Sequence, residues 1–160
     1  MREATSQPLA STSVLSPWRV VNPEPLRAIG RLMIFGGGYT GQRMARALAE
    51  LGIPVTLTHR DENAHPAGPQ PHWLRFDAES GFLPGPDDLA GTTHVLVTIP
   101  PNDQGLDPVL SHLLPTLLPC APAWVGVLST SGVYGDQGGR WVSEASTPQP
   151  VAGRSQARLQ

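Results

Sequence analysis

Apolar runs and stretches with helical spacing alternate along the chain from Arg31 onward. The apolar runs are short and are bounded by glycine, proline or polar residues, which is typical of buried strands. Within these runs the apolar positions are nearly continuous, which predicts a parallel sheet covered on both faces. Five strands are expected, at residues 32–35, 54–58, 72–76, 94–99 and 123–130.

Helical patterns lie between the first two strands and before the fifth. Apolar residues recur at helical spacing from Met44 to Leu51. Asp107 followed by Pro108 predicts the start of a second helix, because aspartate caps the first turn and proline is tolerated at its first position. Pro115 is expected to kink or end that helix. Strands that alternate with helices in this way predict an α/β fold.

The first thirty residues differ from the rest of the chain. They contain four prolines and scattered serine and threonine without helical or strand periodicity. They also lack the basic start and the continuous apolar stretch of a secretory signal. We expect residues 1–29 to be a disordered extension that takes no part in the fold.

Composition narrows the classes of function and partner. The formal net charge is −2 without a basic run, so neither nucleic acid nor a membrane is expected as a partner. Cys120 is the single cysteine, which excludes an intramolecular disulfide and a cysteine-rich zinc site. The five histidines show no metal-ligand spacing, and no metal is expected. All eleven basic residues are arginine, so the chain contains no lysine.

The glycine-rich turn after the first strand is the strongest candidate site. Gly36, Gly38 and Gly41 form a G-x-G-x-x-G pattern between a strand and a helix, which is the context of a dinucleotide fingerprint. Gly36 would allow the tight turn, Gly38 would let the backbone approach the pyrophosphate, and Gly41 would let helix and strand pack closely. With Tyr39 and Thr40, the first turn would hold the phosphates through its N–H groups and the helix dipole. The alternative is a glycine-rich turn without a ligand.

The end of the second strand bears on the choice of dinucleotide. NAD enzymes carry an acidic residue at this strand end, where it binds the ribose 2′-hydroxyl. This chain has His59 and Arg60 there, and its first acidic residue, Asp61, comes slightly further along the chain. A guanidinium binds a 2′-phosphate bidentately. We therefore expect NADP, with NAD as the alternative; the competing interpretation of Arg60 is a solvated loop arginine.

Residues 128–136, followed by Glu144 and Pro148, resemble the fifth strand and following loop of the extended short-chain dehydrogenase/reductases. These are the NAD(P)-dependent epimerases and dehydratases and their atypical relatives, and the resemblance extends from Arg31 to the C-terminus. Together with the glycine motif, it implies that residues 30–160 form an NAD(P)-binding Rossmann domain, a doubly wound parallel sheet with the strand order 3-2-1-4-5.

The resemblance also assigns roles to individual residues. Thr130 matches the residue that hydrogen-bonds the reacting oxygen of the substrate, and Ser131 is its neighbour. Asp77 matches the acidic contact to adenine, while Thr98 and Pro100 lie in the stretch that passes the nicotinamide ribose. The simpler interpretations are that serine and threonine are common at strand ends and that Asp77 caps a turn.

One part of the family pattern is missing. The family's general acid/base is a tyrosine four residues before a lysine, and here Ala152 and Gln156 occupy those positions. Tyr39 and Tyr134 do not match the catalytic tyrosine. A phenol with an ordinary pKa of about 10 needs a tuning cation to act at neutral pH, and alanine carries no transferable proton. The usual chemistry of the family is therefore unsupported.

These observations lead to a functional expectation with two alternatives. We expect the NAD(P)-binding domain of an epimerase/dehydratase-like or reductase-like cytoplasmic protein that acts on a sugar nucleotide or a small carbonyl compound. One alternative is a non-catalytic NADP sensor, and another is a different dehydrogenase family. Gln160 falls inside the helix expected after the fifth strand, so we expect a truncated chain without the C-terminal substrate part. The sequence is also compatible with a homodimer.

Overall fold

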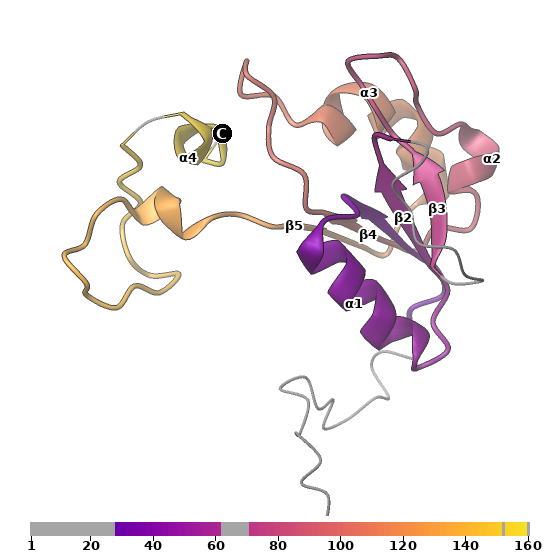
Figure 1. The fold of residues 1–160 in the computed structure, drawn as a ribbon, viewed down its shortest axis with the longest axis horizontal. Coiled ribbons are helices and arrows are strands. Elements are labelled where there is room, and N and C mark those ends of the chain that lie inside the picture. Colours follow the sequence, from indigo (N-terminus) through magenta and orange to yellow (C-terminus); the bar gives the residue numbers. More distant parts are fainter. Residues whose placement is uncertain (1–27, 62–70, 152, 160) are drawn as a thin grey trace, which may run out of the picture.

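Five parallel strands form one sheet in the order β3-β2-β1-β4-β5 (Figure 1). The computed structural model describes residues 28–61, 71–151 and 153–159. Both the predicted α/β class and the predicted strand order are confirmed. The strands are β1 (Leu32–Phe35), β2 (Val55–His59), β3 (His72–Arg75), β4 (His94–Val97) and β5 (Trp124–Val127).

β1 is the centre of the sheet and is buried along its whole length. It pairs in parallel with β2 on one side and with β4 on the other, so that Met33 lies between Thr56 and Val95. Helices cover both faces of β1, and α1 (Tyr39–Ala49) and α3 (Pro108–Leu117) lie on opposite sides of the strands (Figure 1). An apolar side chain is therefore favourable at every position of this strand.

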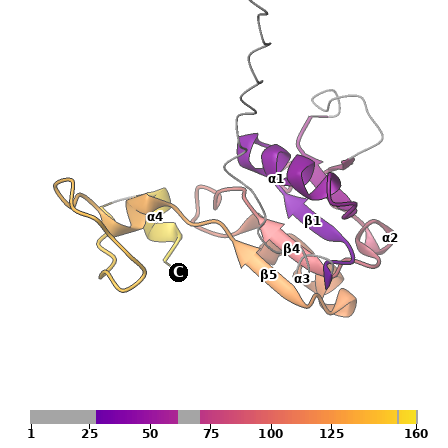
Figure 2. The ribbon, with the colours of Figure 1, turned by 90° about the horizontal axis from the view of Figure 1, so that it is seen from below.

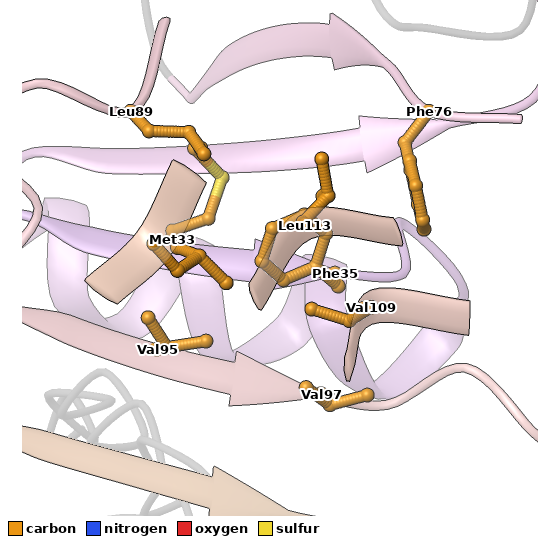
Figure 3. Packing of buried hydrophobic residues seen from close by; sticks show 9 residues of the cluster. Met33, Phe35, Phe76, Leu89, Val95, Val97, Val109 and Leu113 are labelled. Atoms are coloured by element: carbon orange, nitrogen blue, oxygen red, sulfur yellow. The ribbon is translucent and has the colours of Figure 1, made fainter. Parts of the chain in front are cut away.

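Each helix closes its own hydrophobic cluster. On the α1 side, Ala45 and Leu48 pack against alternate residues of β1, β2 and β4. Ile29 packs against the same cluster, so the expectation that the fold begins only after residue 29 is wrong for this residue. Residues 1–27 of the expected extension lie outside the described residues. On the α3 side, the rings of Phe35 and Phe76 meet edge to face with their centroids 5.4 Å apart. The cluster on this side, shown in Figure 3, comprises Met33, Phe35, Phe76, Leu89, Val95, Val97, Val109, Leu113 and Leu117.

α3 begins where the sequence predicts and ends later. The Asp107 carboxylate accepts hydrogen bonds from the backbone N–H groups of Val109 (2.8 Å) and Leu110 (3.1 Å). Pro115, however, lies inside the helix, which continues to Leu117 and into the 3₁₀ turn η2 (Leu118–Cys120). Pro115 lies on the exposed side of α3, so water can satisfy the carbonyl that proline leaves without a donor. Of the two expected outcomes, a kink or an end of the helix at Pro115, the end is wrong, because the helix continues to Leu117.

β5 is exposed, although the sequence predicts a sheet covered on both faces. Val125 and Val127 remain 54% and 49% exposed, and Trp124 remains 45% exposed. β5 is an edge strand that pairs with β4 alone, and the clusters beneath α1 and α3 take residues from β1, β2 and β4 but none from β5. The apolar character of β5 predicts the strand correctly, but not its exposure.

Residues 128–151 and 153–159 form an arm that extends beyond β5 (Figure 1, Figure 2). The arm contains the 3₁₀ turn η3 (Ser131–Tyr134) and the short helix α4 (Arg154–Ala157). A loop within the arm is closed by a hydrogen bond of 2.8 Å from the N–H of Gln149 to the carbonyl of Val133. The helix α2 (Pro86–Leu89) lies between β3 and β4 in the chain. None of the helices in the described ranges is both long and apolar enough to cross a bilayer.

Candidate functional site

The candidate residues gather at the edge of the sheet where the strands end. In the order β3-β2-β1-β4-β5 the chain changes direction of winding between β1 and β4. Open α/β sheets bind ligands in the crevice outside the strand ends at such a switch point. The glycine turn follows β1, and Thr98 follows β4, so both border this crevice.

Gly36 needs to be glycine for two independent reasons. Its φ is +120°, which residues with a side chain rarely adopt, and a Cβ at this position would overlap the Thr98 hydroxyl. The Thr98 hydroxyl oxygen lies 3.1 Å from the carbonyl oxygens of both Phe35 and Gly36. On the other side, the N–H of Gly36 donates to the Thr58 hydroxyl at 3.0 Å. β2 and β4 thus hold the turn between them.

Gly41 serves the close packing of helix and strand. It is buried on the sheet side of α1, and a Cβ there would overlap the carbonyl oxygen of Gly36. Its predicted role therefore has a direct physical basis in the contact between α1 and the turn after β1.

Gly38 is the one glycine of the motif that the fold does not require. Its backbone is extended, with φ −73° and ψ −171°, a conformation open to any residue. No described protein atom lies within 4 Å of the position that a Cβ would take. The space in front of the N-terminus of α1 is therefore open, and a side chain at Gly38 would fill it.

The first turn of α1 presents unpaired backbone donors to this space. Gly38 is the N-cap and supplies no side-chain cap, and the first hydrogen bond within the helix runs from Gln42 to Gly38 at 3.0 Å. The first N–H groups of a helix have no partner inside it. Tyr39 and Thr40 are exposed here, and the guanidinium of Arg43 lies 5.7 Å from the centre of the Tyr39 ring. An eleven-residue helix with such an end attracts anions.

The ends of β2 and β3 bring three of the predicted residues close together. The rings of His59 and Trp73 meet edge to face with centroids 5.7 Å apart, and Trp73 also blocks any side chain at Gly37. Arg60 follows β2 and is exposed. Hydrogen bonding to the Ser80 side chain lowers the pKa of Asp77, and backbone donors together with the charge of Arg60 lower it further. Asp77 is therefore held as an anion beside Arg60.

Asp77 also takes part in a local turn. Its backbone pairs with Phe82 through two hydrogen bonds of 2.8 and 2.9 Å, and its carboxylate lies 3.4 Å from the N–H of Ser80. Asp77 therefore caps a turn, as the simpler interpretation expects. A contact to adenine would have to use the same carboxylate while it also accepts the bond from Ser80.

The predicted catalytic hydroxyls lie apart from the glycine turn. Thr130 and Ser131 are exposed at the base of the arm, where the Thr130 hydroxyl accepts a hydrogen bond from the N–H of Gly132 at 3.2 Å. Within the described part of the chain, no hydrogen bond joins either hydroxyl to the glycine turn. Pro100 is exposed two residues after Thr98.

α4 contains Gln156, which the resemblance matches to the lysine of the family pattern. Ala152 lies outside the described residues, and Gln156 is exposed on α4. The sequence interpretation missed Arg158, whose guanidinium Nη2 donates to the carbonyl of Ile99 at 2.6 Å. The one signal in the sequence was that a basic residue, Arg158, follows two residues after Gln156, which occupies the family's lysine position. Over residues 28–61, 71–151 and 153–159, no three potential metal ligands cluster.

No protein-family model matches the sequence, and no curated protein matches it. Among solved structures, the chain is similar to a functionally unknown conserved protein from Silicibacter pomeroyi, with 36% identity and a TM-score of 0.68, covering 81% of this chain and 45% of that one. It is also similar to a putative NAD-dependent epimerase/dehydratase from Methylobacillus flagellatus, with 22% identity and a TM-score of 0.61, covering 82% and 48%. A third similar structure is MoeE5 in complex with UDP-glucose and NAD, with 22% identity and a TM-score of 0.59, covering 81% and 46%.

These similarities confirm the Rossmann fold and the resemblance to NAD-dependent epimerase/dehydratase structures. The structures from Methylobacillus flagellatus and of MoeE5 are less than 25% identical to this chain, so their similarity shows the fold alone. The chain spans less than half the length of each of these three structures.

Proposed function

We propose that this chain is the dinucleotide-binding part of an NAD(P)-dependent epimerase/dehydratase-like or reductase-like protein. The single observation that carries the proposal is the open space at Gly38, in front of the uncapped N-terminus of α1. A helix N-terminus at the switch point of a doubly wound sheet suits a pyrophosphate, and the fold by itself gives no reason for glycine at this position.

The remaining candidates divide between the two ends of the dinucleotide. The turn from Gly36 to Gly41 would hold the pyrophosphate through the first N–H groups of α1. His59, Arg60 and Asp77 would contact the adenosine, since they lie at the ends of β2 and β3. Thr98 and Pro100, after β4, would line the nicotinamide half. When bound, the nicotinamide would supply a hydride donor or acceptor.

The preference for NADP rests on Arg60. It is exposed at the end of β2, where a guanidinium can reach a 2′-phosphate with two parallel hydrogen bonds. NAD is the alternative, and the complex of MoeE5 with NAD favours it.

Arg60→Ala is expected to weaken NADPH binding about tenfold or more and to leave NADH binding nearly unchanged. A hydrogen bond to a charged group contributes roughly 1.5–3 kcal/mol, which corresponds to about one to two orders of magnitude in Kd. Titration calorimetry of both cofactors with the two proteins provides the measurement. Equal affinity of the wild-type chain for NADPH and NADH would contradict the assignment.

The proposed substrate is a sugar nucleotide or a small carbonyl compound, with Thr130 and Ser131 as the candidate catalytic hydroxyls. Thr130 would orient the reacting oxygen, because a threonine hydroxyl is a poor proton donor without an activating base. The second candidate function is a non-catalytic NADP sensor. It is favoured by Gln156, which stands where the family's lysine would lower the pKa of a tyrosine.

We expect the chain to bind NADPH without catalysing reduction or epimerisation. Its vacant acid/base position offers no proton, so UDP-glucose or a small aldehyde incubated with cofactor should show no turnover by absorbance at 340 nm or by product chromatography. Measurable turnover that disappears in Thr130→Ala would contradict this expectation and would place the chemistry at the end of β5.

A further inference from the structure

Arg158 joins the arm to the sheet at the end of β4. It caps the C-terminus of α4, where its N–H donates to the carbonyl of Arg154 at 3.2 Å. Its guanidinium Nη2 donates to the carbonyl of Ile99 at 2.6 Å, across 59 residues of sequence. The guanidinium is therefore held at the edge of the sheet that carries the candidate site.

Ile99 borders the switch-point crevice on the side of β4. A Cβ built on Gly36 would lie 3.0 Å from a methyl group of Ile99, so Ile99 touches the glycine turn. Because Arg158 is bonded to the carbonyl of Ile99, its charge lies beside the crevice opposite the adenosine end formed by β2 and β3.

The charge of Arg158 is not neutralised by the described part of the chain, where no carboxylate pairs with it. A guanidinium has five N–H donors in a planar fork, and the bond to Ile99 uses a single one of them. The remaining donors can form charge-assisted, bidentate bonds to phosphate oxygens. The positive end of the α1 dipole, at the same crevice, favours the same kind of ligand.

We propose that Arg158 binds the pyrophosphate of the dinucleotide from the β4 side, opposite the N-terminus of α1. This assignment rests on the proposed dinucleotide binding and adds a phosphate-binding residue that the glycine motif does not contain. The chain contains no lysine, and an uncharged glutamine, Gln156, stands at the family's lysine position. Arg158 supplies a positive charge two residues later in the sequence.

The test compares Arg158→Gln with the wild-type chain by titration calorimetry with NADPH and with adenosine 2′-monophosphate. Both ligands carry the 2′-phosphate, but the monophosphate has neither phosphate of the pyrophosphate. We expect Arg158→Gln to weaken NADPH about tenfold or more, to leave the monophosphate within about twofold, and to reduce the salt dependence of NADPH affinity. Arg158→Lys should recover part of the affinity, because it keeps the charge and loses the fork.

Arg154→Gln is the matched control. Arg154 lies one turn earlier on α4 and is exposed, with no described side-chain contact, so its loss should change neither affinity. Unchanged NADPH affinity in Arg158→Gln, or equal weakening of both ligands, would overturn the assignment while leaving the proposed cofactor binding in place. Failure of the wild-type chain to bind NADPH would overturn both.

Discussion

Replacing Gly38 with valine is expected to abolish dinucleotide binding and to leave the domain folded. The valine side chain would fill the open space in front of α1 and cover the N–H groups that would otherwise bind phosphate. Charge-assisted hydrogen bonds contribute roughly 1.5–3 kcal/mol each, so losing two of them weakens binding by about 100-fold or more. Titration with NADPH measures this loss.

The fold should tolerate this change because Gly38 has an ordinary extended backbone and a Cβ there meets no described protein atom. Circular dichroism and the melting temperature of Gly38→Val should therefore match the wild type within a few degrees. Gly85→Val is the matched control, since Gly85 is the extended N-cap of α2 with φ −83°. That control should bind NADPH as the wild type does. If Gly38→Val still binds NADPH, the proposed cofactor site is wrong.

Gly41→Val is expected to show the opposite result, a large loss of stability. A side chain at Gly41 would overlap the carbonyl oxygen of Gly36 and would push α1 away from the sheet. Overpacking of a well-packed contact typically costs about 1–3 kcal/mol. The backbone has little room to relax here, because Thr58 and Thr98 bond the turn from both sides. We expect a loss near the upper value, which corresponds to roughly 10 °C in melting temperature.

Urea unfolding monitored by circular dichroism measures this loss. Ala47→Val is the control on the same helix, since Ala47 is exposed and valine there changes helix propensity alone by a few tenths of a kcal/mol. A Gly41→Val protein as stable as the wild type would show that α1 does not rest on the turn as described. Together, the Gly38 and Gly41 variants separate the ligand-facing glycine from the glycine that packs.

Much of this architecture was predictable because its signals are local. A short apolar run between breakers indicates a strand, and Asp107 before Pro108 indicates a helix start, whatever the rest of the chain does. Crossovers between parallel strands are almost always right-handed, so few strand orders remain for such a chain. The glycine motif was recognisable because its three glycines have a fixed spacing between a strand and a helix.

The contacts that complete the candidate site were not predictable, because they join residues far apart in the chain. The Thr98 hydroxyl meets Gly36 across 62 residues, and no local pattern identifies that pair. Trp73 could be placed on a strand, but its position against Gly37 depends on how β2 and β3 align in register. Arg158 follows no motif, and its bond to Ile99 depends on the path of the arm.

The sequence by itself determined the α/β class and the place of the glycine turn, because periodicity, capping and glycine freedom act over a few residues. The strand order came from the glycine motif together with the resemblance to a known family. Only the tertiary structure decided which surfaces are covered. It leaves β5 exposed although the strand is apolar, and it lets α3 pass Pro115 because that side of the helix faces water. Burial and long-range hydrogen bonds depend on which elements meet in space, and a linear pattern does not contain that information.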